Sequence, residues 1–257
     1  DPALGGYRRI PVMQDGADYY CDSALIADQI AERTATPRLS PFQNDPDIEA
    51  FLAHAEGDIF IAGIMSAPKL KMLVSGLSKR GLGLFKLVAD RASAARQGGM
   101  GGFSAAEGKQ MWADHIADLA TRLSASPFLG GEQPDIRDFA AYHTIWINSI
   151  SAGGTFPPSA SAVVAWRDRM TGFGHGAPDP LSGNAALDIA ANTDPAPLAE
   201  GVRVEPRAAA IAPADYMRDE TRGDLVGETA QSWILARHTD RLGTVHVHFP
   251  KAGYTLV

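Results

Sequence analysis

The stretch 9–30, RIPVMQDGADYYCDSALIADQI, constrains the fold of this chain more than any other part of the sequence. Residues 9–13 and 17–21 are typical of strands, and the Asp15-Gly16 pair between them predicts a tight hairpin turn. An amphipathic helix is predicted to follow from Asp22 and Ser23 onward. A hairpin and one helix bury too little apolar surface to fold alone, so this stretch must belong to a larger unit.

Two features of this stretch point to a binding site for a small peptide-like ligand. Pro11 cannot donate to a strand ladder, so it fits an edge strand or a cis proline that leaves the backbone near Ile10 free. Asp22 and Ser23 lie at the predicted helix N-terminus, where exposed N–H groups favour a carboxylate. A plainer interpretation is that Asp22 or Ser23 only caps the helix and that Pro11 only ends an edge strand.

The composition limits the class of protein. A chain of 257 residues holds one large domain or two to three small ones, and 45% apolar with 21% charged residues is typical of a soluble globular protein. The net charge of −7 gives no basic surface for nucleic acid, and no apolar run is long enough for a membrane span, so we expect neither partner. The single cysteine, Cys21, excludes an internal disulfide and agrees with a cytoplasmic location.

The middle of the chain is predicted to be helical. Asp45-Pro46 is typical of a helix start, and Ser104 with Glu107 forms a capping box before a helix that ends near residue 124. In the segment PFLGGEQPDIRDF, residues 127–139, Asp135 and Asp138 have the spacing of the N-cap and N3 positions. We therefore assign Asp135 and Asp138 structural capping roles.

Three motifs in this order resemble those of glutathione S-transferases. They are Ile10-Pro11 followed by Asp22-Ser23, the Phe-Leu-Gly-Gly loop before a capping box that ends in Asp138-Phe139, and a helix in which Trp166 and Arg167 follow a proline. The resemblance covers about residues 10–174. It implies an α+β multidomain fold, with a partial thioredoxin-like α/β domain over residues 1–36 and an all-helical domain over residues 37–180.

Residues 181–257 extend beyond the end of ordinary glutathione transferases. A short helix is predicted near residues 181–191, and strand-like segments with turn signals follow at about 201–205, 224–228, 232–237 and 243–249. We therefore predict a separate small β-rich domain in this segment.

The resemblance also implies a function. The backbone beside Ile10 and Pro11 would pair with the cysteinyl unit of glutathione, and Asp22 and Ser23 would hold its γ-glutamyl ammonium and carboxylate. The protein would conjugate the glutathione thiolate to a small electrophile and would form a homodimer. Walls of the hydrophobic substrate site would come from the helical domain, with Met65, Met72 and Phe85 as candidates, although a Met or Phe on a helix more often belongs to the core.

No catalytic residue is assigned. The sequence starts with Asp1 and lacks the strand–helix–strand segment that opens the family's thioredoxin-like domain, so we expect a truncated chain whose catalytic Tyr, Ser or Cys is missing. Whether the protein is an enzyme therefore stays open. A non-catalytic binding protein whose β extension recruits a partner is an alternative, and glutathione-dependent isomerisation or reduction is another.

His246 and His248 fall on one face of a predicted strand at a spacing that a metal could use. No further ligand is evident from the sequence, and half-buried strand residues explain the same alternation. We therefore expect no metal. The sequence also contains no nucleophile elbow, P-loop or dinucleotide-binding fingerprint.

Overall fold

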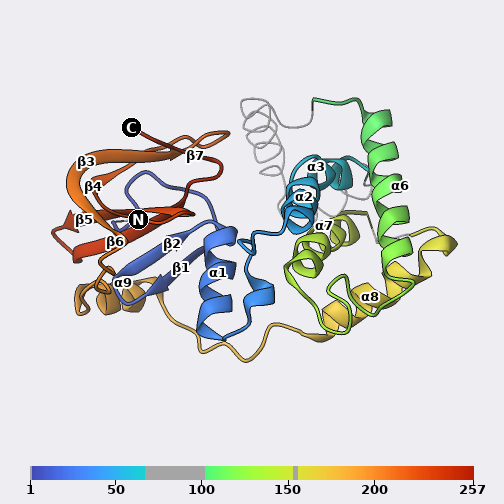
Figure 1. Ribbon diagram of the computed structural model, residues 1–257, viewed down its shortest axis with the longest axis horizontal. Coiled ribbons are helices and arrows are strands. Elements are labelled where there is room, and N and C mark those ends of the chain that lie inside the picture. The colour runs from blue at the N-terminus through green and yellow to red at the C-terminus, as the bar shows by residue number, and fades with distance from the viewer. Residues whose placement is uncertain (1, 67–101, 153–155) are drawn as a thin grey trace. The chain divides into compact units, whose positions relative to one another are not determined.

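The computed structural model describes residues 2–66, 102–152 and 156–257 (Figure 1). The chain divides into two compact units, one made of Asp1–Phe42 with Pro178–Val257 and the other of Gln43–Ala177. None of the helices in the described ranges has both the length and the apolar character needed to cross a bilayer.

The first unit is built on a mixed sheet whose strand order, in the described residues, is β1-β2-β6-β5-β4-β3-β7. The strands are β1 (Val12–Asp15), β2 (Asp18–Cys21), β3 (Arg203–Pro213), β4 (Thr221–Glu228), β5 (Ser232–Thr239), β6 (Gly243–Pro250) and β7 (Tyr254–Leu256). Strands β1 and β2 form the predicted hairpin, with Asp15 opposite Asp18 and Gly16 at a positive φ of 57° in the turn. The Asp15-Gly16 turn prediction is therefore confirmed.

One parallel pairing joins the two ends of the chain. Strand β2 runs parallel to β6, with Asp18 opposite His246 and Tyr20 opposite His248, whereas the other strand pairs are antiparallel. This pairing places the N-terminal hairpin and the C-terminal strands in one sheet.

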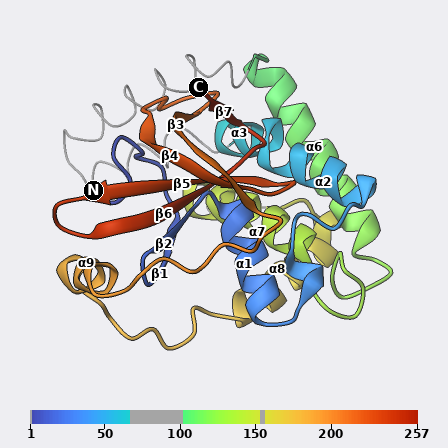
Figure 2. The same cartoon turned by 60° about the vertical axis from the view of Figure 1, so that its left-hand side comes forward.

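Side chains of β6 alternate between the two faces of this sheet. Val245, Val247 and Phe249 are fully buried in an apolar core on one face, so His246 and His248 point to the other face. Helix α9 (Gly183–Ala191) contributes Ala190 to this core and lies beside the β1–β2 hairpin in both views (Figures 1 and 2). Gln14 Nε2 fixes that position by donating to the Ala186 carbonyl oxygen at 2.8 Å.

The second unit is helical and has its own core around the fully buried Trp166. Its described helices are α2 (Pro46–Glu56), α3 (Asp58–Met65), α6 (Ala105–Arg122), α7 (Ile136–Ala152) and α8 (Ser161–Gly172), with a short 3-10 helix at Pro158–Ala160. Asp45 caps α2 through the Asp47 amide, and Ser104 and Glu107 exchange both hydrogen bonds of the capping box. Both helix-start predictions are confirmed.

The α+β class expected from the sequence is confirmed, but the domain boundaries differ from the expected ones. The sequence suggested separate units over residues 1–36 and 181–257, whereas in the structure these segments share one sheet and one core. The physical reason is the β2–β6 pairing, which satisfies backbone groups of both segments at once. A hairpin that is too small to fold alone is thereby stabilised by strands from the other end of the chain.

Candidate functional site

The first predicted site segment lies at an outer edge of the sheet. Strand β1 pairs with β2 on one side and is the outer strand on the other. The Ile10–Pro11 peptide directly before it is cis, which is one of the two arrangements that the sequence suggested, and the Ile10 side chain is 88% exposed. Backbone groups along this edge therefore have no strand partner in the described part of the chain.

The second predicted site segment is the start of helix α1 (Ser23–Arg33). Asp22 is its N-cap, and its Oδ1 accepts from the Ala24 amide at 3.0 Å. Asp22 has φ 80° and ψ 142°, a backbone conformation that non-glycine residues rarely adopt and that costs free energy. Ser23, the first residue of the helix, is exposed. Asp22 is therefore a helix cap, as the plainer interpretation proposed, in an unusual conformation that presents an exposed serine beside it.

Tyr254, which also contacts Tyr7, donates a hydrogen bond to Asp22. The Tyr254 hydroxyl, from β7, lies 3.1 Å from Asp22 Oδ2 and donates to it, and it also lies 3.0 Å from the Tyr7 hydroxyl. Burial, together with the neighbouring Asp22 carboxylate and Tyr7, raises the pKa of Tyr254 far above its ordinary value. The Tyr254 hydroxyl thus keeps its proton, so the C-terminal strand supplies a neutral donor to Asp22. Sequence reasoning missed this contact because nothing local links residues 22 and 254.

The segment that leads to Pro11 is anchored by Arg9. The Arg9 guanidinium pairs with Asp215, donates to the Tyr216 carbonyl oxygen and lies 4.1 Å from the centre of the Tyr216 ring. Only 13% of the Arg9 side chain is exposed. These contacts hold the approach to β1 against the β3–β4 connection.

The residues expected to line a hydrophobic substrate site belong to the helical unit or lie outside the described residues. Met65 is the last residue of α3, whereas Met72 and Phe85 fall in the range 67–101, which the structure does not describe. Their role as substrate-site walls stays a prediction.

The two aspartates given capping roles are both buried at the start of α7. Asp138 is fully buried and accepts four hydrogen bonds, from the amides of Leu129, Gly130 and Asp135 and from the Trp166 indole. Asp135 accepts from the Arg137 amide and forms an ion pair with the Arg137 guanidinium. All the acceptor positions of Asp138 are thus taken up by the protein itself, which suits a structural role.

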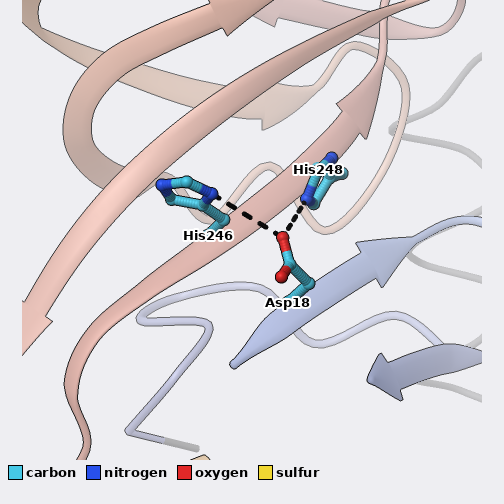
Figure 3. A group of neighbouring side chains, drawn as sticks. All are labelled: Asp18, His246 and His248. Carbon is cyan, nitrogen blue, oxygen red and sulfur yellow. Dashed lines mark hydrogen bonds and ion pairs between the residues drawn. The ribbon is translucent and has the colours of Figure 1, made fainter. Parts of the chain in front are cut away.

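A second group of polar side chains lies on the sheet face opposite the apolar core. Asp18, His246 and His248 each offer one ligand atom, and these three atoms lie within 4.8 Å of one another (Figure 3). His248 Nε2 is 2.8 Å from Asp18 Oδ1, within hydrogen-bond distance, and His246 Nδ1 is 3.7 Å from the same oxygen. The sequence singled out the two histidines but not Asp18, because only the parallel β2–β6 pairing brings Asp18 opposite His246.

Asp18 is ionised and firmly held. Burial raises the pKa of its carboxyl group, but the imidazoles of His246 and His248 and the Ala196 amide outweigh burial, so the pKa lies below its ordinary value. The Ala196 amide donates to Oδ2 at 2.7 Å, which leaves Oδ1 facing the histidines. His246 also lines a pocket of about 410 Å³ with Pro195–Leu198, Arg203 and Thr244.

Comparison with known proteins agrees with the fold. No protein-family model matches this sequence, and no curated protein matches it. Among solved structures, the chain is similar to a GST-like protein from Pseudomonas syringae, with a TM-score of 0.75 and 30% sequence identity over 99% of this chain and 84% of that chain. Likeness at this identity along nearly the whole sequence extends beyond a shared fold, and the chain therefore belongs to the GST-like proteins, named for glutathione S-transferase.

Proposed function

We propose that this protein binds glutathione at the outer edge of β1 and the N-terminus of α1, and that it conjugates the glutathione thiolate to a small electrophile. The observation that carries the proposal is the Asp22-Ser23 helix start, next to an exposed strand edge, in a chain that belongs to the GST-like proteins. Ile10, Pro11, Asp22 and Ser23 are the proposed binding residues.

The strand edge suits the peptide part of glutathione. An extended ligand can add to an exposed sheet edge through main-chain hydrogen bonds, and the backbone of Ile10 and of Val12 offers such groups on either side of Pro11. Ile10 is exposed, so a ligand can reach this backbone from solvent. The cysteinyl unit of glutathione would take this place.

The helix start suits the γ-glutamyl end. The N-terminus of α1 favours a carboxylate because its first N–H groups and the positive end of the helix dipole face outward, and the Ser23 hydroxyl adds a donor there. The Asp22 carboxylate suits the ligand ammonium. Each of its oxygens accepts one hydrogen bond from the protein, and a carboxylate has about four acceptor positions, so Asp22 keeps capacity for the ligand.

The glutathione thiolate requires a hydrogen-bond donor, and we assign none among the residues that the structure describes. Catalysis in this class depends on lowering the pKa of the glutathione thiol, since the thiolate is the nucleophile. Cys21 is unsuited to any role in that step because it is buried, and burial raises the pKa of its thiol well above its ordinary value. We assign no catalytic residue, and the electrophile, a homodimer and a cytoplasmic location remain predictions from the resemblance.

One observation favours a second function, that of a GST-like binding protein without conjugating activity. The Tyr254 hydroxyl donates to Asp22 Oδ2, so the C-terminal strand already occupies part of the acceptor that would hold the glutathione ammonium. In that case the β strands at the C-terminus would bind a partner, and Asp22 would only cap helix α1.

Calorimetric titration of glutathione tests both functions. The protein should bind glutathione, and Ser23→Ala should lower the affinity roughly 10- to 100-fold, because a hydrogen bond to a charged group contributes about 1.5–3 kcal/mol. Ser159→Ala, which changes an exposed serine of the helical unit, is the matched control and should leave the affinity unchanged. Equal affinity in wild type and Ser23→Ala would remove the assigned site.

Tyr254→Phe separates the two functions. If wild type shows no binding heat but Tyr254→Phe binds glutathione, the tyrosine blocks the site and the non-catalytic function is supported. If wild type binds, its turnover of a chromogenic aromatic electrophile then decides whether it conjugates.

A further inference from the structure

We propose that Asp18, His246 and His248 form a binding site for a divalent transition-metal ion such as Zn²⁺, at the wall of the pocket beside β6. This site is independent of the glutathione proposal, because it lies on other residues and uses other chemistry. Two imidazole nitrogens and one carboxylate oxygen are a ligand set that Zn²⁺ and Fe²⁺ both accept.

The spacing of the ligand atoms fits a small metal ion. Zinc bonds of about 2.0–2.2 Å at tetrahedral angles place neighbouring ligand atoms about 3.3 Å apart. Asp18 Oδ1 lies 2.8 Å from His248 Nε2 and 3.7 Å from His246 Nδ1, so the two distances fall on either side of that value. All three atoms lie within 4.8 Å of one another, and Figure 3 shows both rings turned toward the same carboxylate oxygen. Small rotations of these side chains would therefore bring them to bonding distance of one ion.

The surroundings hold the ligands in place. The Ala196 amide binds Asp18 Oδ2 at 2.7 Å and so orients Oδ1 toward the histidines. The Tyr20 ring stacks on His248 with 4.4 Å between ring centres and 21° between planes. Such outer contacts are what orient metal ligands in known sites. The side chains of the three proposed ligands are largely buried, with 5% of Asp18, 14% of His246 and 11% of His248 exposed.

A purely structural hydrogen-bonded triad is the alternative, and it explains only part of the arrangement. It accounts for His248, whose Nε2 is within hydrogen-bond distance of Asp18. It leaves His246 Nδ1 buried and 3.7 Å from Asp18 Oδ1, which is too far for a hydrogen bond, and that nitrogen has no other hydrogen-bond partner among the described residues, although buried polar atoms are nearly always paired. A metal ion would bond to that nitrogen directly and would use the negative charge of Asp18.

The site would be open on one side. Three protein ligands with a free fourth position are typical of catalytic zinc sites, whereas structural sites are closed by four. Of the three ligands only His246 lines the pocket of about 410 Å³, and a water molecule or a small ligand atom that enters from this pocket could complete the coordination. Pro195, Leu198, Val204 and Val226 give this pocket an apolar wall.

Calorimetric titration of Zn²⁺ into chelator-treated, tag-free protein tests the proposal. Wild type should bind one equivalent, and His246→Ala should lower the affinity at least about 100-fold, because losing even an outer partner of a metal site costs about 10- to 100-fold. His246 makes no hydrogen bond through Nδ1, so this variant should fold, and its circular dichroism checks that it does. Asp18→Asn, which keeps the shape of the side chain, should weaken binding similarly.

His238→Ala is the matched control, because His238 is an exposed histidine of the neighbouring strand β5, outside the cluster. It should bind Zn²⁺ as wild type does. Absence of binding by wild type, or equal affinity in wild type and folded His246→Ala, would overturn the proposal. Loss of binding in His238→Ala with retention in His246→Ala would likewise overturn it, by moving the metal to the exposed histidine.

Discussion

The start of α7 allows a demanding test of the assigned structural role of Asp138. Its Oδ1 accepts from the Leu129 amide at 2.8 Å and from Trp166 Nε1 at 2.7 Å. Its Oδ2 accepts from the amides of Gly130 and Asp135, both at 3.0 Å. The residue is fully buried, so water cannot replace a lost partner. One side chain thus joins the loop before α7, the N-terminus of α7 and helix α8.

Asp138→Asn keeps the shape of this side chain and removes its charge and half of its acceptors. The amide oxygen can serve one pair of donors, while the NH₂ group faces the other pair. Two hydrogen bonds to a charged group are then lost, at about 1.5–3 kcal/mol each, so we expect the free energy of unfolding to fall by about 3–6 kcal/mol. A loss of 3 kcal/mol in a domain of this size corresponds to a fall in melting temperature of about 6–12 °C.

Tryptophan fluorescence can follow the helical unit alone. Of the four tryptophans, only Trp233 lies in the sheet-containing unit, so Trp233→Phe leaves three reporters in the helical unit. Urea unfolding of Asp138→Asn in this background should give the expected loss, and glutathione affinity, where measurable, should not change. Asp168→Asn is the control, because Asp168 is 64% exposed and pairs with its neighbour Arg167. A loss below about 1 kcal/mol in Asp138→Asn would refute the reasoning.

Three further expectations follow from buried groups. Tyr254→Phe should lower the free energy of unfolding by about 1.5–3 kcal/mol in urea titration, because Asp22 loses a buried donor. Burial, together with the nearby His54, lowers the pKa of His115 to about 4, whereas an unfolded histidine has a pKa of about 6.5. The unfolded state therefore binds more protons than the folded state between these pH values. The free energy of unfolding should fall by about 2–3 kcal/mol from pH 7.5 to pH 4.5 for this reason. His115→Gln should remove that part of the decrease. Cys21 should resist a thiol reagent in the folded protein and react in denaturant, because it is buried and its thiol pKa is raised.

The features that sequence reasoning predicted correctly are local ones. The Asp15-Gly16 turn, the Asp45 cap and the Ser104–Glu107 capping box each depend on a few neighbouring residues, so their chemistry is readable from the sequence. Helix α1 begins at Ser23 as expected, since Asp22 can bind the Ala24 amide whatever lies beyond. The family resemblance rested on the same short-range signals.

The features that sequence reasoning missed depend on residues far apart in the chain. The strand-like segments near the C-terminus were predicted, but nothing in their pattern reveals that β6 pairs with β2 at the other end of the chain. The prediction of a separate domain over residues 181–257 followed from that gap. Asp18 was predicted only as part of a strand, because its partners His246 and His248 are more than 220 positions away.

The two proposed sites lie at opposite ends of strand β2 and are separate. Asp18 begins this strand and Asp22 follows its end, and four residues of extended chain span roughly 13 Å. A metal ion bound to Asp18 therefore does not reach the Asp22 carboxylate, and glutathione held at Ser23 does not need the histidines. Because the ligand atoms are separate, absence of zinc binding would leave the glutathione proposal intact, and absence of glutathione binding would leave the metal proposal intact. What the sites share is β2 itself, whose place between β1 and β6 positions both carboxylates.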